Sequence, residues 1–135
     1  MSKLDITLTL AEVLAIDKAC TLLENSTYKS LKTSFKISLL KSKIAPEVKI
    51  YNEEFQKLVT KYAKPIENEP GTYKWEPATY PTALKELETL SQHKVTITVQ
   101  PLFIEDLEQI EPVPSAEILY KLAPVIHDYE NSYKN

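Results

Sequence analysis

The side chains that could carry out chemistry are few, and they are scattered along the chain. His93 and His127 fall in different predicted elements, and neither has an acid–base partner close by in the sequence. The run His127-Asp128 followed by Glu130 does not have the ligand spacing of a metal site. We therefore interpret both histidines as surface or helix-end residues rather than as catalytic bases.

The single cysteine and the paired carboxylates do not predict a reaction centre either. A nucleophile needs an adjacent base and a third group that orients the base, and the pattern around Cys20 offers neither. Because a lone cysteine cannot form an internal disulfide, we expect Cys20 to be a small core residue in a reducing compartment. Glu53 and Glu54 point to different sides of a predicted helix, and one glycine cannot build a phosphate-binding loop. We therefore expect no catalytic, cofactor-binding or metal-binding residues, and no enzyme activity.

Binding is the remaining chemistry, and two clusters of opposite charge are candidates for it. The basic ridge falls within a narrow arc of one predicted helix and consists of Lys29, Lys32, Lys36 and Lys43. The acidic turn follows a late strand and consists of Glu105, Asp106, Glu108 and Glu111. The ridge is either a solvated lysine face or a docking surface for an acidic partner, and the two clusters can pair within one chain or between subunits. We predict self-association that weakens with salt and is lost when Lys32 and Lys36 are both changed to Glu.

Two aromatic residues are a third candidate for protein binding. Proline followed by glycine at Pro70-Gly71 suits a type II turn. Tyr73 and Trp75 lie on one side of the arm that returns from this turn. They either pack back on a helix or form an exposed anchor, since aromatic residues are favoured at interface hot spots.

Length and composition exclude several classes of function. The chain has 135 residues, enough for one domain (1–135) with a real core, and its formal net charge is −3. All 16 basic side chains are lysine. Arginine is the preferred residue for forked phosphate and guanine contacts, so we expect no specific nucleic-acid binding; an AT-rich genome would explain the same usage. The amino terminus resembles neither a signal peptide nor an anchor and no apolar run is long enough to span a membrane, so we expect a protein that is not secreted.

The longest regular pattern predicts a helix over residues 28–63 with apolar stripes on two opposite sides. One stripe comprises Ile37, Leu40, Ile44, Val48, Tyr51, Phe55, Leu58 and Tyr62, and the other comprises Tyr28, Leu31, Phe35 and Leu39. A helix that is apolar on two sides lies between two layers. We therefore predict that Phe35, Leu39, Leu40 and Phe55 are buried and that Phe35→Ala costs ~3–5 kcal/mol. Because Pro46 lacks an N–H and clashes with the preceding turn, we expect a kink or break between Lys43 and Pro46.

Alternating apolar residues predict half-buried strands over residues 4–10 and 94–100. Each strand has one aliphatic face and one threonine-rich face, which favours direct pairing of the two strands. Two strands alone are marginal, so this sheet must lean on the helices. Leu102–Ile104 could continue the second strand at an edge.

Capping signals predict the remaining helices. Thr9 and Glu12 have capping-box spacing at the start of a helix that continues to about Glu24. Residues 25–27 would end that helix and cap the long one. Pro81 begins a helix that ends at Gln92-His93, and Ser115 caps a final helix that reaches Tyr129 and is disturbed by Pro124. The predicted fold is α+β and mostly helical: an antiparallel helical hairpin with a long kinked helix, packed on a small two- to three-stranded antiparallel sheet.

The order of these elements resembles a family of small uncharacterised proteins encoded by tailed bacteriophages. The resemblance rests on the long lysine-containing helix YKSLKTSFKISLLKSKIAPEVKIYNEEFQKLVTKYAKP, the strand and acidic turn VTITVQPLFIEDLE, and the final helix SAEILYKLAPVI. It covers most of the chain and implies no catalytic residues. It implies the setting of a phage gene product, located in the virion or in the host cytoplasm.

We therefore expect a non-enzymatic structural or assembly protein, such as a virion head, neck or tail component, that acts through helical protein–protein contacts. Its partners would be copies of itself or other virion proteins, without a membrane or a cofactor. The alternative is a soluble inhibitor or adaptor that binds one host protein through an acidic or aromatic patch.

Overall fold

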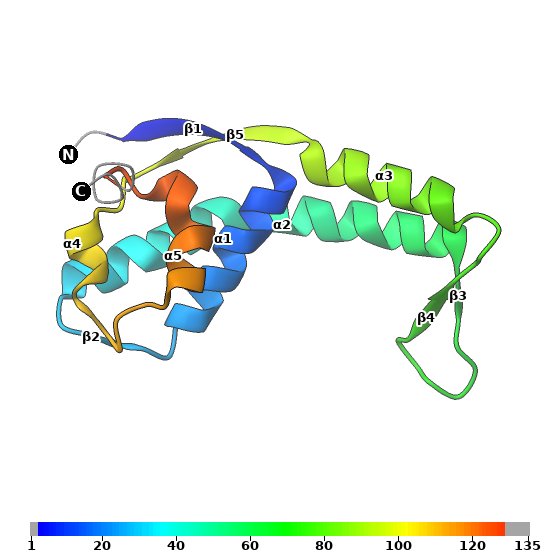
Figure 1. Cartoon of the computed structure of the whole chain (residues 1–135), viewed down its shortest axis with the longest axis horizontal. Coiled ribbons are helices and arrows are strands. Elements are labelled where there is room, and N and C mark those ends of the chain that lie inside the picture. The colour runs from blue at the N-terminus through cyan, green and yellow to red at the C-terminus, as the bar shows by residue number, and fades with distance from the viewer. Residues whose placement is uncertain (1–2, 129–135) are drawn as a thin grey trace.

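One helix organises the molecule. The structure is a computed structural model that describes residues 3–128. Its longest element, α2 (Leu31–Tyr62), runs from one end of the molecule to the other (Figure 1). The other helices are α1 (Leu10–Leu23), α3 (Tyr80–Gln92), α4 (Ile104–Leu107) and α5 (Ala116–Leu122), followed by the short 3-10 helix η1 (Ala123–Val125). The strands are β1 (Leu4–Thr9), β2 (Thr27–Tyr28), β3 (Ala63–Pro65), β4 (Tyr73–Trp75), β5 (Lys94–Val99) and β6 (Ile110–Glu111).

The first half of α2 belongs to a head that holds most of the core. The helix α1 packs along it and buries Val13, Ile16 and Cys20 completely. The ribbon of β1 and β5 covers one side of these helices, and α4 and α5 complete the head (Figure 1). This arrangement confirms the predicted α+β, mostly helical fold with α1 and α2 as a helical hairpin.

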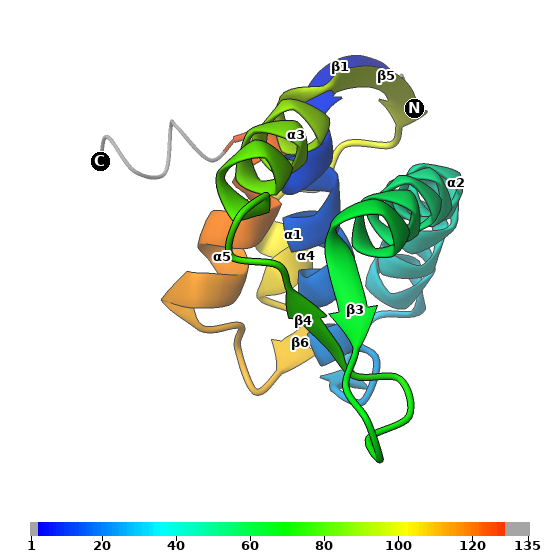
Figure 2. The ribbon, with the colours of Figure 1, turned by 90° about the vertical axis from the view of Figure 1, so that its right-hand side faces the viewer.

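The second half of α2 forms an arm with α3 and with the hairpin of β3 and β4. Viewed from the end of the arm, the hairpin lies nearest and the two helices run back from it toward the head (Figure 2). Within the described residues, Ala83 is the only fully buried residue of α3. Trp75 of β4 packs back on both helices, with its ring centroid 6.3 Å from that of Phe55 and 6.2 Å from that of Tyr80. The arm therefore has a thin apolar interface closed by aromatic rings.

The predicted strands pair directly. In the antiparallel register of β1 and β5, Ile6 lies opposite Ile97 and Thr7 lies opposite Thr96, whose hydroxyl oxygens are 3.1 Å apart. The β-structure of the described residues comprises three separate two-stranded pieces, β1–β5, β2–β6 and β3–β4, rather than one sheet. Leu102 does not extend β5 but forms a single parallel bridge to Ile126.

Local chemistry explains several element boundaries. Thr9 and Glu12 form the predicted capping box: the Thr9 hydroxyl accepts from the Glu12 N–H at 3.1 Å, and the Glu12 carboxylate accepts from the Thr9 N–H at 2.9 Å. Between β3 and β4 the Thr72 N–H donates to the Glu69 carbonyl at 3.1 Å, and Gly71 has a φ of 81°. This is the geometry of a type II turn, which favours glycine because an L side chain disfavours positive φ.

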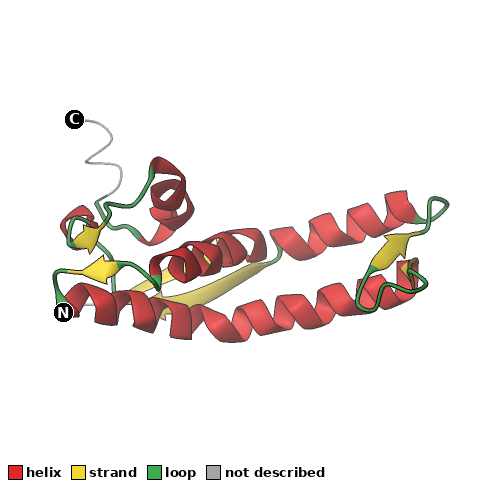
Figure 3. Cartoon of the chain, turned by 90° about the horizontal axis from the view of Figure 1, so that it is seen from below, coloured by secondary structure: helices red, strands yellow, loops and turns green. Residues whose placement is uncertain are grey.

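The predicted interruption at Pro46 does not occur as a break. The helix α2 comprises 32 residues and includes Pro46. Its ribbon is unbroken along its whole length (Figure 3). Pro46 is exposed, so its ring and its missing hydrogen bond fall on the solvent side, where water can satisfy the freed carbonyl. The predicted start was also wrong, because Tyr28 lies in β2 and the N-cap residue of α2 is Ser30.

The predicted burial of α2 on two sides is wrong for its first half. The stripe that contains Ile37, Leu40 and Ile44 is buried. On the opposite side, Leu31 is 87% exposed and Phe35 is 61% exposed. Leu39 is half-buried, as is Phe55 in the arm. Among the described residues, the core of the head lies on one side of α2, and Leu31 and Phe35 of the second stripe face solvent. The predicted final helix is shorter than expected, since Pro124 lies in η1, and its predicted member Tyr129 lies outside the described residues.

Candidate protein-binding surface

The basic ridge and the acidic turn meet within one chain. The Lys36 ammonium donates to Asp106 Oδ2 at 2.8 Å, and the side chains of Lys36 and Asp106 are only 3% and 8% exposed. The same carboxylate oxygen accepts from the Phe103 N–H at 2.9 Å, and the Lys36 ammonium lies 5.2 Å from the centre of the Phe103 ring. Lys36 thus serves as an internal tie between α2 and α4 and is not available to a partner.

A second ridge residue is also paired inside the chain. The Lys29 ammonium lies 3.0 Å from a carboxylate oxygen of Glu111, and both side chains remain about half exposed. This pair accompanies the short ladder of β2 and β6, where the Lys29 N–H donates to the Gln109 carbonyl at 2.7 Å. Exposed pairs of this kind contribute little to stability. Their effect here is to reduce the free positive charge of the ridge.

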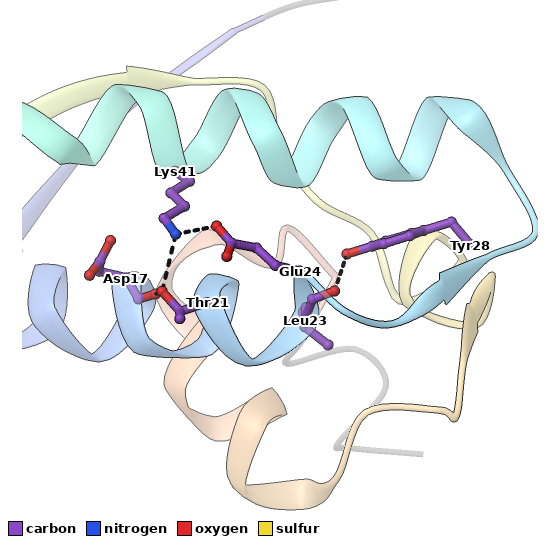
Figure 4. A network of polar contacts seen from close by, with 6 residues as sticks. All are labelled: Asp17, Thr21, Leu23, Glu24, Tyr28 and Lys41. Atoms are coloured by element: carbon purple, nitrogen blue, oxygen red, sulfur yellow. Dashed lines mark hydrogen bonds and ion pairs between the residues drawn. The ribbon is translucent and has the colours of Figure 1, made fainter.

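A third pairing, not anticipated from the sequence, joins α1 to α2. Lys41 reaches from α2 to the Glu24 carboxylate and to the Thr21 hydroxyl at 3.2 Å (Figure 4). The hydrogen bond to Glu24 raises the pKa of Lys41. Nearby, the Tyr28 hydroxyl donates to the Leu23 carbonyl at the end of α1 at 2.8 Å (Figure 4), and the same carbonyl accepts from the Ser26 N–H at 3.1 Å.

The remaining ridge lysines, Lys32 and Lys43, are exposed and form no ion pair with another described residue. They lie along one side of an apolar strip, which we call the outer stripe, formed by Leu31, Phe35 and Leu39. Successive members of the stripe are four residues apart, so the stripe winds around the helix by about 40° per step. Leu31 and Phe35 are large apolar side chains that face solvent from a regular helix. Such contiguous exposed apolar surface marks interaction sites more often than single exposed residues do.

The outer stripe ends at a small hollow between α2 and β5. The hollow has a volume of about 210 Å³, and its apolar lining includes Leu39, Leu40 and Val99. Two exposed lysines, Lys3 and Lys43, also line it. A cavity of this size can take one side chain rather than a whole small molecule.

The other predicted binding residues are spread over the molecule. Glu105 of α4 and the C-cap residue Glu108 are exposed, whereas Asp106 between them is buried. Tyr73 is 44% exposed at the hairpin of the arm. Trp75 instead packs against Phe55 and Tyr80, which is the first of the two alternatives expected for this pair. The structure does not bring these residues together with the outer stripe.

The residues with catalytic potential do not converge. Cys20 is fully buried in the core of the head. Burial, reinforced by the negative charge of Asp17, raises the pKa of the Cys20 thiol to about 12. A thiol of this kind is unreactive at neutral pH. His93 caps the end of α3, and the His127 ring lies 5.4 Å from the ring of Phe103. Among residues 3–128, no group of three or more His, Cys, Asp or Glu side chains could hold a metal ion.

The burial of Lys36 was missed because the four ridge lysines look equivalent on a helical projection. Lys36 lies one turn before Leu40 and beside Ile37, which are both buried, whereas Lys32 and Lys43 point further toward the outer stripe. Asp106 is the third residue after Phe103, where a carboxylate caps a helix, but this local signal does not mark Lys36 as its partner.

No protein-family model, curated protein or solved structure matches the chain. No helix within the described residues is both long and apolar enough to cross a membrane.

Proposed function

We propose that the chain is a non-enzymatic structural or assembly protein that acts through helical protein–protein contacts. The single observation that carries this proposal is the outer stripe on α2. Leu31 and Phe35 are 87% and 61% exposed although they belong to a regular helix that is packed on its opposite side. Burying an apolar side chain of this size is worth ~1.5–3 kcal/mol. A partner that covers both would therefore gain a few kcal/mol from the hydrophobic effect.

The bacteriophage setting is part of the same proposal and rests on the sequence resemblance alone. In that setting the chain would be a component of the virion head, neck or tail. The alternative function is an adaptor or inhibitor that binds one host protein. Tyr73 supports the alternative, because its exposed ring at the hairpin of the arm provides a second, separate contact.

The decisive experiment compares assembly of the wild-type protein with that of a Leu31→Ser/Phe35→Ser variant. Since both side chains are exposed, the variant should fold normally and lose its contacts with partners. Tyr120→Ser is the matched control, because Tyr120 is 76% exposed on α5 in a different region. The measurements are crosslinking and mass spectrometry of purified particles that contain each form.

Incorporation of the wild type and the control, but not of the stripe variant, would support the proposal. Absence of the wild-type chain from particles would refute the virion assignment and favour the adaptor. Equal incorporation of all three forms would show that the outer stripe does not mediate assembly.

A further inference from the structure

We propose that the outer stripe binds an acidic amphipathic helix of a different protein, and that a second copy of this chain does not cover it. This inference rests on the proposed function, because it names the partner of the same surface. It depends on three features: the exposed apolar residues, the lysines beside them and the hollow at the end of the stripe.

The apolar residues match one face of a partner helix. Leu31, Phe35 and Leu39 are separated by single turns, so they present a continuous strip to a helix that crosses at a shallow angle. Helix-in-groove recognition uses anchors at the same spacing on the bound segment. One anchor of the partner can enter the hollow of about 210 Å³ that is lined by Leu39, Leu40 and Val99.

The charges specify an acidic partner. Lys32 lies beside the first half of the stripe, and Lys43 and Lys3 lie at the hollow. Lys29 and Lys36 are already neutralised by Glu111 and Asp106. The charge that α2 leaves for a partner is therefore positive, and carboxylates beside the partner's apolar face would meet it. Complementary charges of this kind fix the register and exclude incorrect partners.

The same charges argue against self-association through this surface. From Lys29 to Ala45 the sequence contains five lysines and no acidic residue. Antiparallel pairing of two copies of α2 along the outer stripe would therefore bring Lys32 and Lys43 close to like charges. The acidic turn of a second copy is a poor substitute, because α4 is four residues long and none of its large apolar side chains is among the exposed ones.

An anionic membrane is also a weaker match than a protein. Membrane-surface helices combine a broad apolar face with many basic residues. Here two large exposed side chains and three lysines face outward from a chain whose formal net charge is −3. Vesicle binding is therefore included as an outcome that would overturn the proposal.

The test uses two synthetic helical peptides and NMR spectra of the full chain. The first peptide carries leucine at every fourth position with glutamates beside the leucines, and the second has lysine in place of each glutamate. We expect saturable binding of the acidic peptide only, with chemical-shift changes centred on Leu31, Phe35 and Leu39. Lys32→Glu/Lys43→Glu should weaken binding of the acidic peptide by ~tenfold or more and create binding of the lysine peptide.

Lys85→Glu/Lys94→Glu is the matched control, because it changes the net charge equally at exposed lysines of the arm and of β5. Its peptide affinity should equal that of the wild type. Equal binding of both peptides, shifts centred elsewhere, or preferential binding to vesicles of anionic phospholipid would overturn the inference. A wild-type dimer that is lost in Leu31→Ser/Phe35→Ser would assign the surface to a second copy and would also overturn it.

The particle and peptide experiments together distinguish failure of this inference from failure of the proposed function. Wild-type assembly into particles without peptide binding would leave the function standing and reject the acidic helix as the partner. Absence from particles together with tight, charge-selective peptide binding would reject the proposed function and support the acidic helix as the partner.

Discussion

The buried pair of Lys36 and Asp106 is the residue-scale feature with the largest expected energetic effect. Two charges removed from water are tolerated because they neutralise each other at 2.8 Å and because Asp106 also caps α4. Lys36→Met should therefore destabilise the protein by ~3–5 kcal/mol, because it leaves a buried carboxylate without a cation. The double change Lys36→Met/Asp106→Leu should recover most of that loss. Urea denaturation of both single variants and the double variant provides the measurement.

The same pair changes the meaning of the double variant Lys32→Glu/Lys36→Glu. A glutamate at position 36 would face Asp106 in the core, so any loss of association would reflect unfolding. If Lys36→Met is as stable as the wild type, the pair is not buried in solution and Lys36 becomes a third available lysine of the ridge beside Lys32 and Lys43.

Phe35 and Leu40 provide a second residue-scale comparison, because they lie on opposite sides of the same helix. Leu40 is 3% exposed, so Leu40→Ala should cost ~2–5 kcal/mol. Phe35 is 61% exposed, so Phe35→Ala should change stability by less than about 1 kcal/mol. Thermal unfolding of the two variants checks the difference. A large loss for Phe35→Ala would restore the two-layer model expected from the sequence and remove the outer stripe as a free surface.

The reactivity of Cys20 is a third residue-scale test, because it measures whether the core of the head is closed to solvent. Burial raises the pKa of the Cys20 thiol in the folded protein to about 12, from its usual 9.0. The contribution of this group to stability is thus complete below pH 9 and is lost as the pH rises toward 12. We expect a thiol reagent at pH 8 to modify Cys20 only at the rate at which the protein opens, and at full rate in urea. Immediate labelling of the folded protein would place Cys20 outside the core.

At the scale of elements, Pro46 allows a direct test of how α2 is held together. A proline inside a helix costs ~3 kcal/mol in an unconstrained context, yet α2 continues through it because Ile44 and its neighbours are anchored on the core. Pro46→Ala should therefore stabilise the protein by about 1–3 kcal/mol. Ser42→Ala, at another exposed position of the same helix, is the control and should have a much smaller effect. Unchanged stability of Pro46→Ala would mean that this part of α2 already frays in solution.

Local signals made most elements predictable from the sequence. The alternation in residues 4–10 and 94–100 predicted the pairing of β1 with β5. The helix caps were predicted from Thr9 and Ser115, and the turn between β3 and β4 was predicted from Pro70-Gly71. The burial of α2 was only half predictable, because helical spacing shows that Leu31 and Phe35 are aligned but not whether a second layer exists to cover them. Likewise, the pairing of Lys36 with Asp106 joins residues 70 positions apart, and no local pattern encodes such a contact.

At the scale of the whole molecule, the head and the arm should differ in local stability. Six residues of α1 are buried in the head, whereas Ala83 is the only buried residue of α3 within the described chain. We therefore expect the amides of α3 to exchange with solvent through local opening at a lower free energy than those of α1. Native-state hydrogen exchange in low urea measures both. Equal protection of the two helices would show that the molecule opens as one cooperative unit.

The uninterrupted α2 has a further consequence, because it makes the chain a molecular ruler. At 1.5 Å per residue its 32 residues span about 48 Å. The outer stripe lies near one end of this span, and the hairpin with Tyr73 lies beyond the other. Two partners, one bound at the outer stripe and one bound at the hairpin, would therefore be held at a fixed distance from each other. Each residue inserted into the second half of α2 would increase that distance by about 1.5 Å and rotate the hairpin by about 100° around the helix axis.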